Sequence, residues 1–387
     1  MKSKWIYVIL VTLFAVFFLN SCLPLSTSSK EVSIVIDRSG INRNATLVLA
    51  QDGLNGEWKE LTGTDGKYKF TVNDPDGVYS IVAVDKSGNS SDIELFHSTL
   101  AERKAVNIEF QATPETDFAQ LTINLPATYE ASQVTTFFRQ YVPGIIKQSS
   151  VTVQIPKSKS DLVVFIGTKQ DSSQKVYIKR DFEIKNAETL NIEEKDLKTL
   201  ESLTTSDIYY FWIINNTHTL PVVFNKKIPN MATNDRYLAV YGDLLAGKLW
   251  FKVTKDVPVS LSNKIKDFTP PTTTIISDKK TDSNGLPEIT FIPYESTISD
   301  YKTRLYTFSI YKFGSPSKHT VNITPGYLTK VGNKYKFPNI TLSQWKDEYK
   351  PARDYTIQNL MVFLSPNQIE EFSAFKLGTE YLAFGIQ

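Results

Sequence analysis

Apolar and polar residues alternate along the N-terminal third of the chain. Val32, Ile34 and Ile36 occupy every second position, which is the period of a β-strand with one buried face. Further segments of this kind span residues 46–50, 67–72, 79–84 and 106–110. Asp-Gly and Gly-Asn pairs lie between them, and such pairs form tight turns between antiparallel strands. The pattern therefore predicts an all-β fold built from antiparallel β-sandwiches.

The pattern then repeats further along the chain. The matching segments keep the same order, with 32–34 matched by 121–123, 79–84 by 162–166, and 106–109 by 190–193. A repeat of this length is near the size of a seven-stranded immunoglobulin-like sandwich. We therefore expect two tandem immunoglobulin-like modules, one at residues 32–111 and one at residues 118–195.

Beyond residue 195 the pattern changes. Leucines at helical spacing within residues 192–203 predict a short helical connector, which we place at 196–206. The apolar run at 208–214 then predicts a strand buried on both faces. We expect a β-rich region at 207–285 and a C-terminal β-sandwich at 286–387. The sequence leaves open whether these two regions form one domain.

The first residues follow a different pattern. Lys2 and Lys4 precede an apolar run at 5–19, which is shorter than the roughly 20 residues of a membrane-spanning helix. This order is typical of an export signal peptide, here residues 1–21. The segment 19–22, which ends in Cys22, resembles the lipobox of bacterial lipoproteins. An ordinary secretory signal beside an unmodified thiol is the alternative.

The lipobox resemblance implies lipidation of Cys22 with palmitate-like chains and a tether at residues 22–31. It also implies a lipid-anchored location in the cell envelope, with the membrane as the first partner. Leu23 rather than Asp follows the cysteine. By the sorting rule of such lipoproteins this implies the outer membrane if the organism has one, and otherwise the outer face of the cytoplasmic membrane.

Charge excludes one class of partner. The 43 basic residues fall to 41 once the two lysines of residues 1–21 are removed, which equals the 41 acidic residues. Nucleic-acid binders carry a basic excess, so we expect no nucleic-acid partner. Because Cys22 is the only cysteine, no intramolecular disulfide can form and stability must come from apolar burial.

Motifs of the first module are similar to those of known sandwiches. The segments 66–72 and 77–88 resemble immunoglobulin-like and carboxypeptidase-regulatory-like sandwiches of envelope proteins. A second resemblance is to starch-binding modules, on the residues Asn55, Trp58, Lys59, Asp65, Gly66, Tyr68, Phe70, Gly77 and Tyr79. Ser87-Gly88-Asn89 stands where those modules carry a second stacking aromatic. This resemblance implies a polysaccharide ligand contacted by Trp58.

Trp250 is the second candidate binding residue. In the strand predicted at 248–254, Leu249, Phe251 and Val253 share one face and Trp250 shares the other with two lysines. Since the apolar trio is expected to take the core, we expect the indole on the outer face. There it serves as a ligand platform, or it is covered by the lysine stems or by the adjoining module.

Signals of catalysis and metal binding are scarce. The histidines His97, His218 and His319 lie about 100 residues apart, and none has a partner at metal-ligand spacing. The acidic turn at 74–77 is explained by carboxylates that bond their own backbone, and a calcium site there is the less favoured alternative. We expect no catalytic residue, no metal and no cofactor, although two carboxylates distant in sequence would escape this inspection.

Three functions remain open. The leading hypothesis is a non-enzymatic, membrane-anchored envelope lipoprotein whose sandwiches form a structural or interaction scaffold for an envelope protein. The second is a glycan-binding lipoprotein that uses exposed Trp58 and Trp250 to bind a polysaccharide. The third is an envelope hydrolase. The first leads because nothing in the sequence requires more.

Overall fold

The structure is a computed structural model. It describes residues 30–38, 41–42, 44–110, 118–136, 139–141, 149–157, 160–167, 175–203, 208–214, 218–220, 226–228, 232–233, 235–243, 248–271, 275–366 and 380–386. Strands dominate the described chain and helices are short, so the all-β prediction is confirmed. Cys22 and most of the predicted tether lie outside the described residues. Among the described residues, no helix is long and apolar enough to span a membrane.

The first unit of the chain is a sandwich of two sheets. Its strands are β1 (Glu31–Arg38), β2 (Ile41–Asn42), β3 (Leu47–Asp52), β4 (Trp58–Glu60), β5 (Lys67–Thr71), β6 (Val78–Ser87), β7 (Ser90–Thr99) and β8 (Ala105–Phe110). One sheet holds β2, β1 and β5, with β8 parallel to β1. The other runs β7-β6-β3-β4. The turns between strands come from Asp-Gly pairs, as at Gly66 with a φ of 71°.

The second unit has the same strand order. Its strands are β9 (Phe118–Asn124), β10 (Glu130–Thr136), β11 (Arg139–Tyr141), β12 (Ser150–Pro156), β13 (Ser160–Gly167), β14 (Lys175–Phe182) and β15 (Glu188–Asn191). Here β9 pairs with antiparallel β12 and parallel β15, as β1 does with β5 and β8. Even the register agrees, because Ile34 is opposite Val106 and Ile123 is opposite Leu190.

The rest of the chain forms further strands, and eight of them share one sheet with strands of the first unit. The further strands are β16 (Lys198–Thr199), β17 (Glu201–Ser202), β18 (Tyr209–Ile214), β19 (His218–Leu220), β20 (Lys226–Lys227), β21 (Arg236–Asp243), β22 (Lys248–Thr254), β23 (Ile276–Thr281), β24 (Pro287–Phe291), β25 (Lys302–Tyr311), β26 (Ser317–Ile323), β27 (Lys334–Lys336), β28 (Thr356–Ser365) and β29 (Glu380–Ile386). The short helices are η1 (Glu194–Asp196), α2 (Asn263–Lys266), α3 (Pro325–Lys330) and η2 (Asp347–Tyr349).

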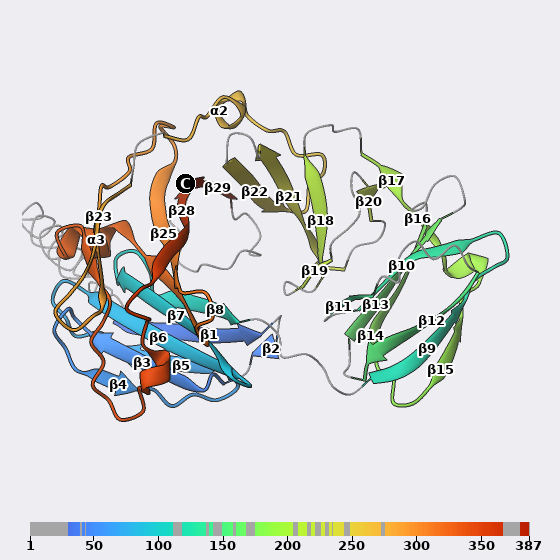
Figure 1. Ribbon diagram of the computed structural model, residues 1–387. Helices are drawn as coiled ribbons and strands as arrows, with labels where there is room; N and C mark the ends of the chain where they lie inside the picture. The colour runs from blue at the N-terminus through green and yellow to red at the C-terminus, as the bar shows by residue number, and fades with distance from the viewer. Residues whose placement is uncertain are drawn as a thin grey trace, which may run out of the picture.

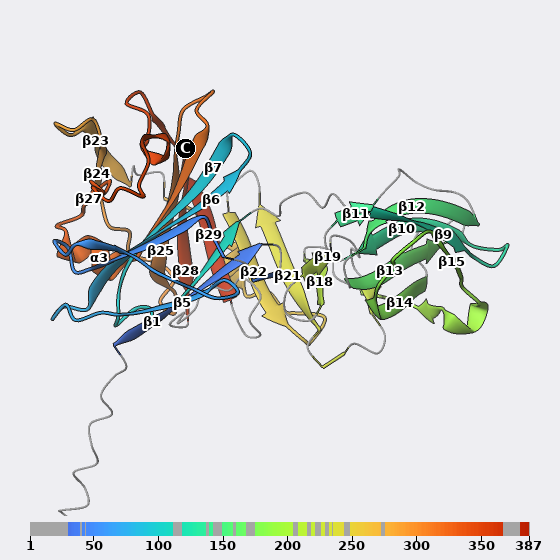
Figure 2. The same cartoon turned by 90° about the horizontal axis from the view of Figure 1, so that it is seen from below.

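One 12-stranded sheet connects the first unit to the C-terminal strands. Its order is β19-β18-β21-β22-β29-β28-β25-β26-β7-β6-β3-β4. The join is a parallel pairing in which β26 lies along β7 from Ser317 opposite Ser91 to Ile323 opposite His97. Strands of the regions 207–285 and 286–387 lie in this same sheet. The second unit lies at the other end of the molecule (Figures 1 and 2). It is not isolated there, because Val163, Phe165 and Val176 of β13 and β14 belong to the same apolar core as Tyr210 and Tyr237.

The large sheet is covered on both faces near β6. Tyr79, Ile81 and Ala83 face the first unit's own core. The alternate residues Val82 and Val84 face the opposite way, into a core shared with the C-terminal region. All five side chains are fully buried. A strand buried on both faces has a near-continuous apolar sequence, which explains why residues 78–84 show little alternation.

The helical connector predicted within residues 192–203 is wrong. Apart from the single turn η1, this segment forms the short strands β16 and β17. Lys198 and Thr199 pair with β14, and Leu200 is buried in the large core. The leucine spacing fitted a helix, but the backbone bonds offered by neighbouring strands decide the conformation.

Candidate functional site

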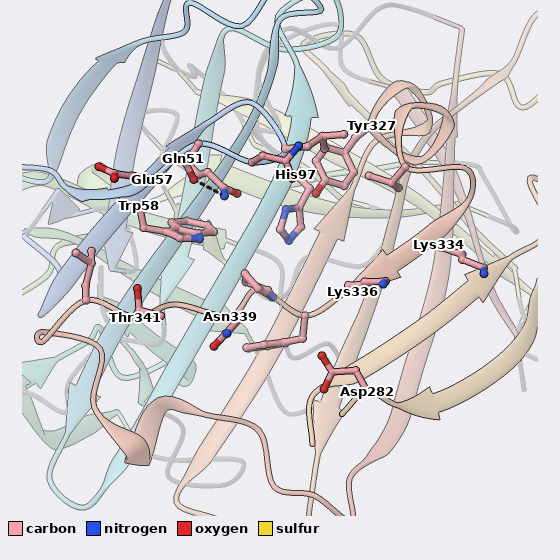
Figure 3. A pocket seen from close by; sticks show the side chains of 17 residues that line it. Gln51, Glu57, Trp58, His97, Asp282, Tyr327, Lys334, Lys336, Asn339 and Thr341 are labelled. Carbon is pink, nitrogen blue, oxygen red and sulfur yellow. Dashed lines mark hydrogen bonds between the residues drawn. The ribbon is translucent and has the colours of Figure 1, made fainter. Parts of the chain in front are cut away.

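A groove of about 900 Å³ lies at the β4 edge of the large sheet, on the face that packs against the C-terminal region. One wall is the segment from Gln51 to Trp58, and the other is formed by β27 and residues 337–342. His97 of β7 and Tyr327 of α3 lie between the walls (Figure 3). The groove therefore exists only because the first unit and the C-terminal region are joined.

Trp58 occupies a prominent place in the groove. It begins β4 opposite Gln51 of β3, and its indole is half-buried against the large core. The loop before it is held by a hydrogen bond from Gln51 Nε2 to the Gly56 carbonyl at 2.8 Å. A Cβ on Gly56 would lie 2.1 Å from the Asp52 carbonyl oxygen, so this loop requires glycine. The sequence identified Trp58 as a candidate, and the structure places it where a ligand can reach its ring.

His97 lies at the floor of the groove. Its ring is only 1% exposed, and Nδ1 is 2.8 Å from the Ser80 hydroxyl. The rings of Tyr327 and Tyr335 pack against it, with centroids at 5.0 and 5.3 Å. Among the described residues, its Nε2 has no hydrogen-bond partner. Burial lowers the pKa of His97 to about 3, so the ring is neutral. Sequence reasoning missed this placement.

Glu102 fixes the wall that carries Tyr327. Its carboxylate accepts hydrogen bonds from the Gly326 amide at 2.7 Å, from the Thr99 hydroxyl at 3.0 Å and from the Thr324 hydroxyl. A side chain at Gly326 would place a Cβ 2.5 Å from the carboxylate, which would then have to move from this position. The start of α3 is thereby held against the end of β7.

Charges along the groove are balanced and mostly engaged. Asp282 Oδ1 accepts backbone amides of Asn284 and Leu286, each at 2.8 Å. Lys336 lies 3.3 Å from a Glu288 oxygen in an ion pair. Glu57 and Lys334 are exposed and have opposite charges. The groove has no net formal charge from these lining residues, namely Glu57, Asp282, Lys334 and Lys336.

Trp250 does not lie on an open surface, so the expectation of an exposed indole is wrong. The ring is 2% exposed and belongs to the large core. Its Nε1 donates to Glu380 at 3.0 Å, and Tyr301 donates to the same oxygen at 2.6 Å. Leu249 and Phe251, which were expected in the core, are only half-buried, whereas segments distant in sequence cover the face that carries Trp250. This burial removes the basis for a ligand platform at Trp250.

Lys248, the neighbour of Trp250 on that face, is also buried. Its ammonium donates to the backbone carbonyls of Phe268 at 2.8 Å and of Lys266. These carbonyls lie at and just beyond the end of α2, where unpaired carbonyl groups attract a cation. Lys248, which was expected to lie beside an exposed indole, therefore binds the backbone after α2 to the sheet. No pattern in the sequence indicated it.

The remaining titratable candidates have structural partners. His319 Nε2 lies 2.8 Å from the Tyr349 carbonyl, and burial lowers the pKa of His319 to about 4. The side chain of His218 lies outside the described residues. In the acidic turn, Asp74 accepts the amides of Asp76 and Val78 at 3.0 and 2.9 Å, which confirms its interpretation as a turn. Within the described part of the chain, no group of three or more His, Cys, Asp or Glu residues is arranged to hold a metal ion.

Comparison with known proteins adds no identification. No protein-family model and no curated protein matches the chain. Fervidolysin from Fervidobacterium pennivorans, a keratinolytic enzyme related to subtilisin, is 14% identical over 41% of this chain and 28% of its own, with a TM-score of 0.18. The Bacillus anthracis TIE protein is 11% identical over 58% of this chain and 45% of its own, with a TM-score of 0.17.

The chain thus spans less than half the length of these two solved chains. The N-terminal four Ig domains of Dscam1 isoform 8.4 are 9% identical over 93% of this chain and 97% of theirs, with a TM-score of 0.12. At such TM-scores none of these likenesses carries an argument about fold or function.

Proposed function

We propose that the protein is a non-enzymatic, membrane-anchored lipoprotein of the bacterial cell envelope that serves as an interaction scaffold. The observation that carries this proposal is the pairing of β26 with β7. It connects the unit next to the tether with the C-terminal strands in one sheet. Because the first unit and the C-terminal strands share this sheet, the surfaces of both are held in a fixed position relative to the membrane anchor.

We also infer that the first two units are duplicated immunoglobulin-like sandwiches. Their equal strand order and the equal register of Ile34 and Ile123 support this inference. Each unit has its own apolar core, around Val32 and Tyr79 in the first and around Leu121 and Ile166 in the second.

The buried titratable groups support a non-enzymatic role. The pKa values of His97 and His319, about 3 and about 4, leave both rings neutral near pH 7 and unsuited to proton transfer there. Although burial pushes the pKa of Glu380 upward, hydrogen bonds from Tyr301, Lys252 and Trp250 hold it below its usual value. His319 and Glu380 thus have hydrogen-bond partners within the fold.

Replacement of Cys22 by serine tests the anchor. Lipid chains bury many methylene groups in a bilayer, and two such chains suffice for stable attachment. Cys22→Ser should therefore move the protein from the membrane fraction to the soluble fraction and abolish the lipid mass on the N-terminal peptide. Continued membrane attachment of the variant, together with an unmodified wild-type peptide, would contradict the proposal.

Glycan binding is a second candidate function, and the position of Trp58 favours it. The indole is half-buried, lines an open groove and lies near amide and hydroxyl side chains such as Asn55 and Thr341. An aromatic ring beside groups that both donate and accept hydrogen bonds suits a ligand rich in hydroxyl groups.

A further inference from the structure

The groove is a composite of two regions far apart in sequence. Trp58 and Asn55 come from the first unit, while Asn339 and Thr341 come from the segment after β27. Its volume of about 900 Å³ lies within the range of small-molecule sites. Figure 3 shows Trp58, His97 and Asn339 around the same space. A ligand there would contact both regions at once.

His97 provides the feature that points to a ligand. Buried polar atoms almost always have a hydrogen-bond partner, and an exception calls for an explanation. Nδ1 has the Ser80 hydroxyl at 2.8 Å, but Nε2 has no partner among the described residues. The ring lines the groove and is held in place by Tyr327 and Tyr335. Because Nε2 has almost no exposed area, a ligand hydroxyl can bond it only when the side chains that cover the ring move aside.

The charges select the class of ligand. Two acids and two lysines line the groove, namely Glu57, Asp282, Lys334 and Lys336. Asp282 and Lys336 already have partners within the protein. An anion such as a phosphate would find no group of free cations there, whereas the neutral groups Asn55, Asn339 and Thr341 are exposed. The groove thus favours an uncharged ligand.

We propose that this groove binds a neutral saccharide of one or two rings, which stacks on Trp58 and hydrogen-bonds His97 Nε2 at the floor. This inference rests on the glycan-binding candidate and names its ligand class. Because the walls come from two regions, the ligand stabilises their join. His97 is a binding residue in this site, and Ser80 is the residue that orients it.

The test uses the purified full chain and a panel of neutral oligosaccharides of one to six units, with uronic-acid and sulfated counterparts. Binding is measured by calorimetry. Trp58→Ala should weaken the neutral ligand about tenfold or more. His97→Asn keeps a polar atom near the position of Nδ1, beside Ser80, but removes Nε2. It should weaken binding about threefold to tenfold. His97→Gln, which restores a polar group near Nε2, should recover part of the loss.

Phe313→Ala is the matched control, because Phe313 is 92% exposed and is not among the residues that line the groove. It should leave affinity unchanged. Thermal unfolding of each variant separates lost binding from lost folding. If His97→Asn fails to fold, the imidazole nitrogen signals of the wild type provide the second readout, since the bound saccharide should shift the Nε2 resonance.

Each other outcome overturns a stated part of the proposal. Binding of acidic oligosaccharides alone would overturn the neutral class, and insensitivity to Trp58→Ala would overturn the location. An Nε2 resonance that does not move on binding would overturn the role of His97. If no oligosaccharide binds, the saccharide inference fails, while the membrane-anchored scaffold still stands or falls with the Cys22→Ser experiment.

Discussion

The first and second units share a strand order but differ at one edge. In the first unit, β7 pairs with the seven-residue strand β26. In the second, the equivalent β14 pairs with the two-residue strand β16. An edge strand has unpaired backbone N–H and C=O groups that can pair with a further strand. Of the two units, only the first pairs this edge with a long strand. The same sandwich can therefore keep its sheet almost to itself or become part of a larger sheet, although in both units side chains of the sheet also pack into the large core.

Acid should affect the two regions unequally, and this is the largest expected effect. His97 and His319 lie in the joined sheet, whereas residues 118–200 contain no histidine. Both pKa values are lowered in the fold from 6.5, to about 3 and about 4. Below pH 6.5 the unfolded chain therefore binds more protons than the folded chain. The contribution of these histidines to the free energy of unfolding is complete above pH 6.5 and is lost as the pH falls. Each histidine contributes up to about 1.4 kcal/mol per pH unit.

Calorimetry at pH 7 and pH 4.5 measures this difference. Burial raises the pKa of Glu94 in β7 to about 8, so protonation of this carboxylate offsets part of the loss caused by the two histidines. The transition of the joined body should still move down in temperature by more than the transition of the second unit. His97→Asn and His319→Gln should each flatten the dependence between pH 4.5 and 6.5. Equal shifts of both transitions in the wild type would contradict the assignment of acid sensitivity to these rings.

Two equivalent isoleucines test the independence of the units. Ile34 and Ile123 are buried at the same register position. Truncation of either to alanine should cost about 2–5 kcal/mol. Ile123→Ala should speed hydrogen exchange most in β9 to β15, whose core contains this side chain. Ile34→Ala should also speed exchange in β25 and β28, because Leu305 and Phe363 of those strands pack against the first unit's core. Unchanged exchange there would show that the joined regions unfold separately.

A proline in β16 should have the smallest effect. Thr199 lies opposite Lys175 at the edge of the second unit, and proline removes one backbone donor. Thr199→Pro should therefore cost about 1 kcal/mol in chemical denaturation. The matched change is Thr320→Pro in β26, where Thr320 is paired with both Glu94 and Ser309. It should destabilise the joined body far more. Similar losses from the two substitutions would mean that the long pairing adds little.

Local patterns in the sequence predicted the strands well but not their partners. The alternation at Val32, Ile34 and Ile36 gave β1 with the correct face, since all three are buried. Strand alternation also placed Tyr68 inward, where it is 5% exposed. The pairing of β7 with β26 left no local trace, because backbone hydrogen bonds between distant strands depend on no particular side chain.

The same limit explains the outcome for the candidate site. Trp58 was accessible to sequence reasoning, because it stands at a matching position of the pattern of starch-binding modules. His97 was not, since the groove floor is formed only when Tyr327 and Tyr335 arrive from the C-terminal region. Trp250 was misjudged for the same reason. The indole is covered by Tyr301 and Glu380, and no residue of the strand itself predicts these contacts.

The pairing of β7 with β26 also sets an order on folding. Ser98 and Thr324, which are hydrogen-bonded at the end of this pairing, are 226 residues apart in the sequence. Contacts of such separation form late, because a long loop must close first. Until then β7 presents an open edge of ten residues that can pair with another chain. The unit nearest the tether, although first to be made, therefore completes its fold only after the C-terminal third of the chain has emerged.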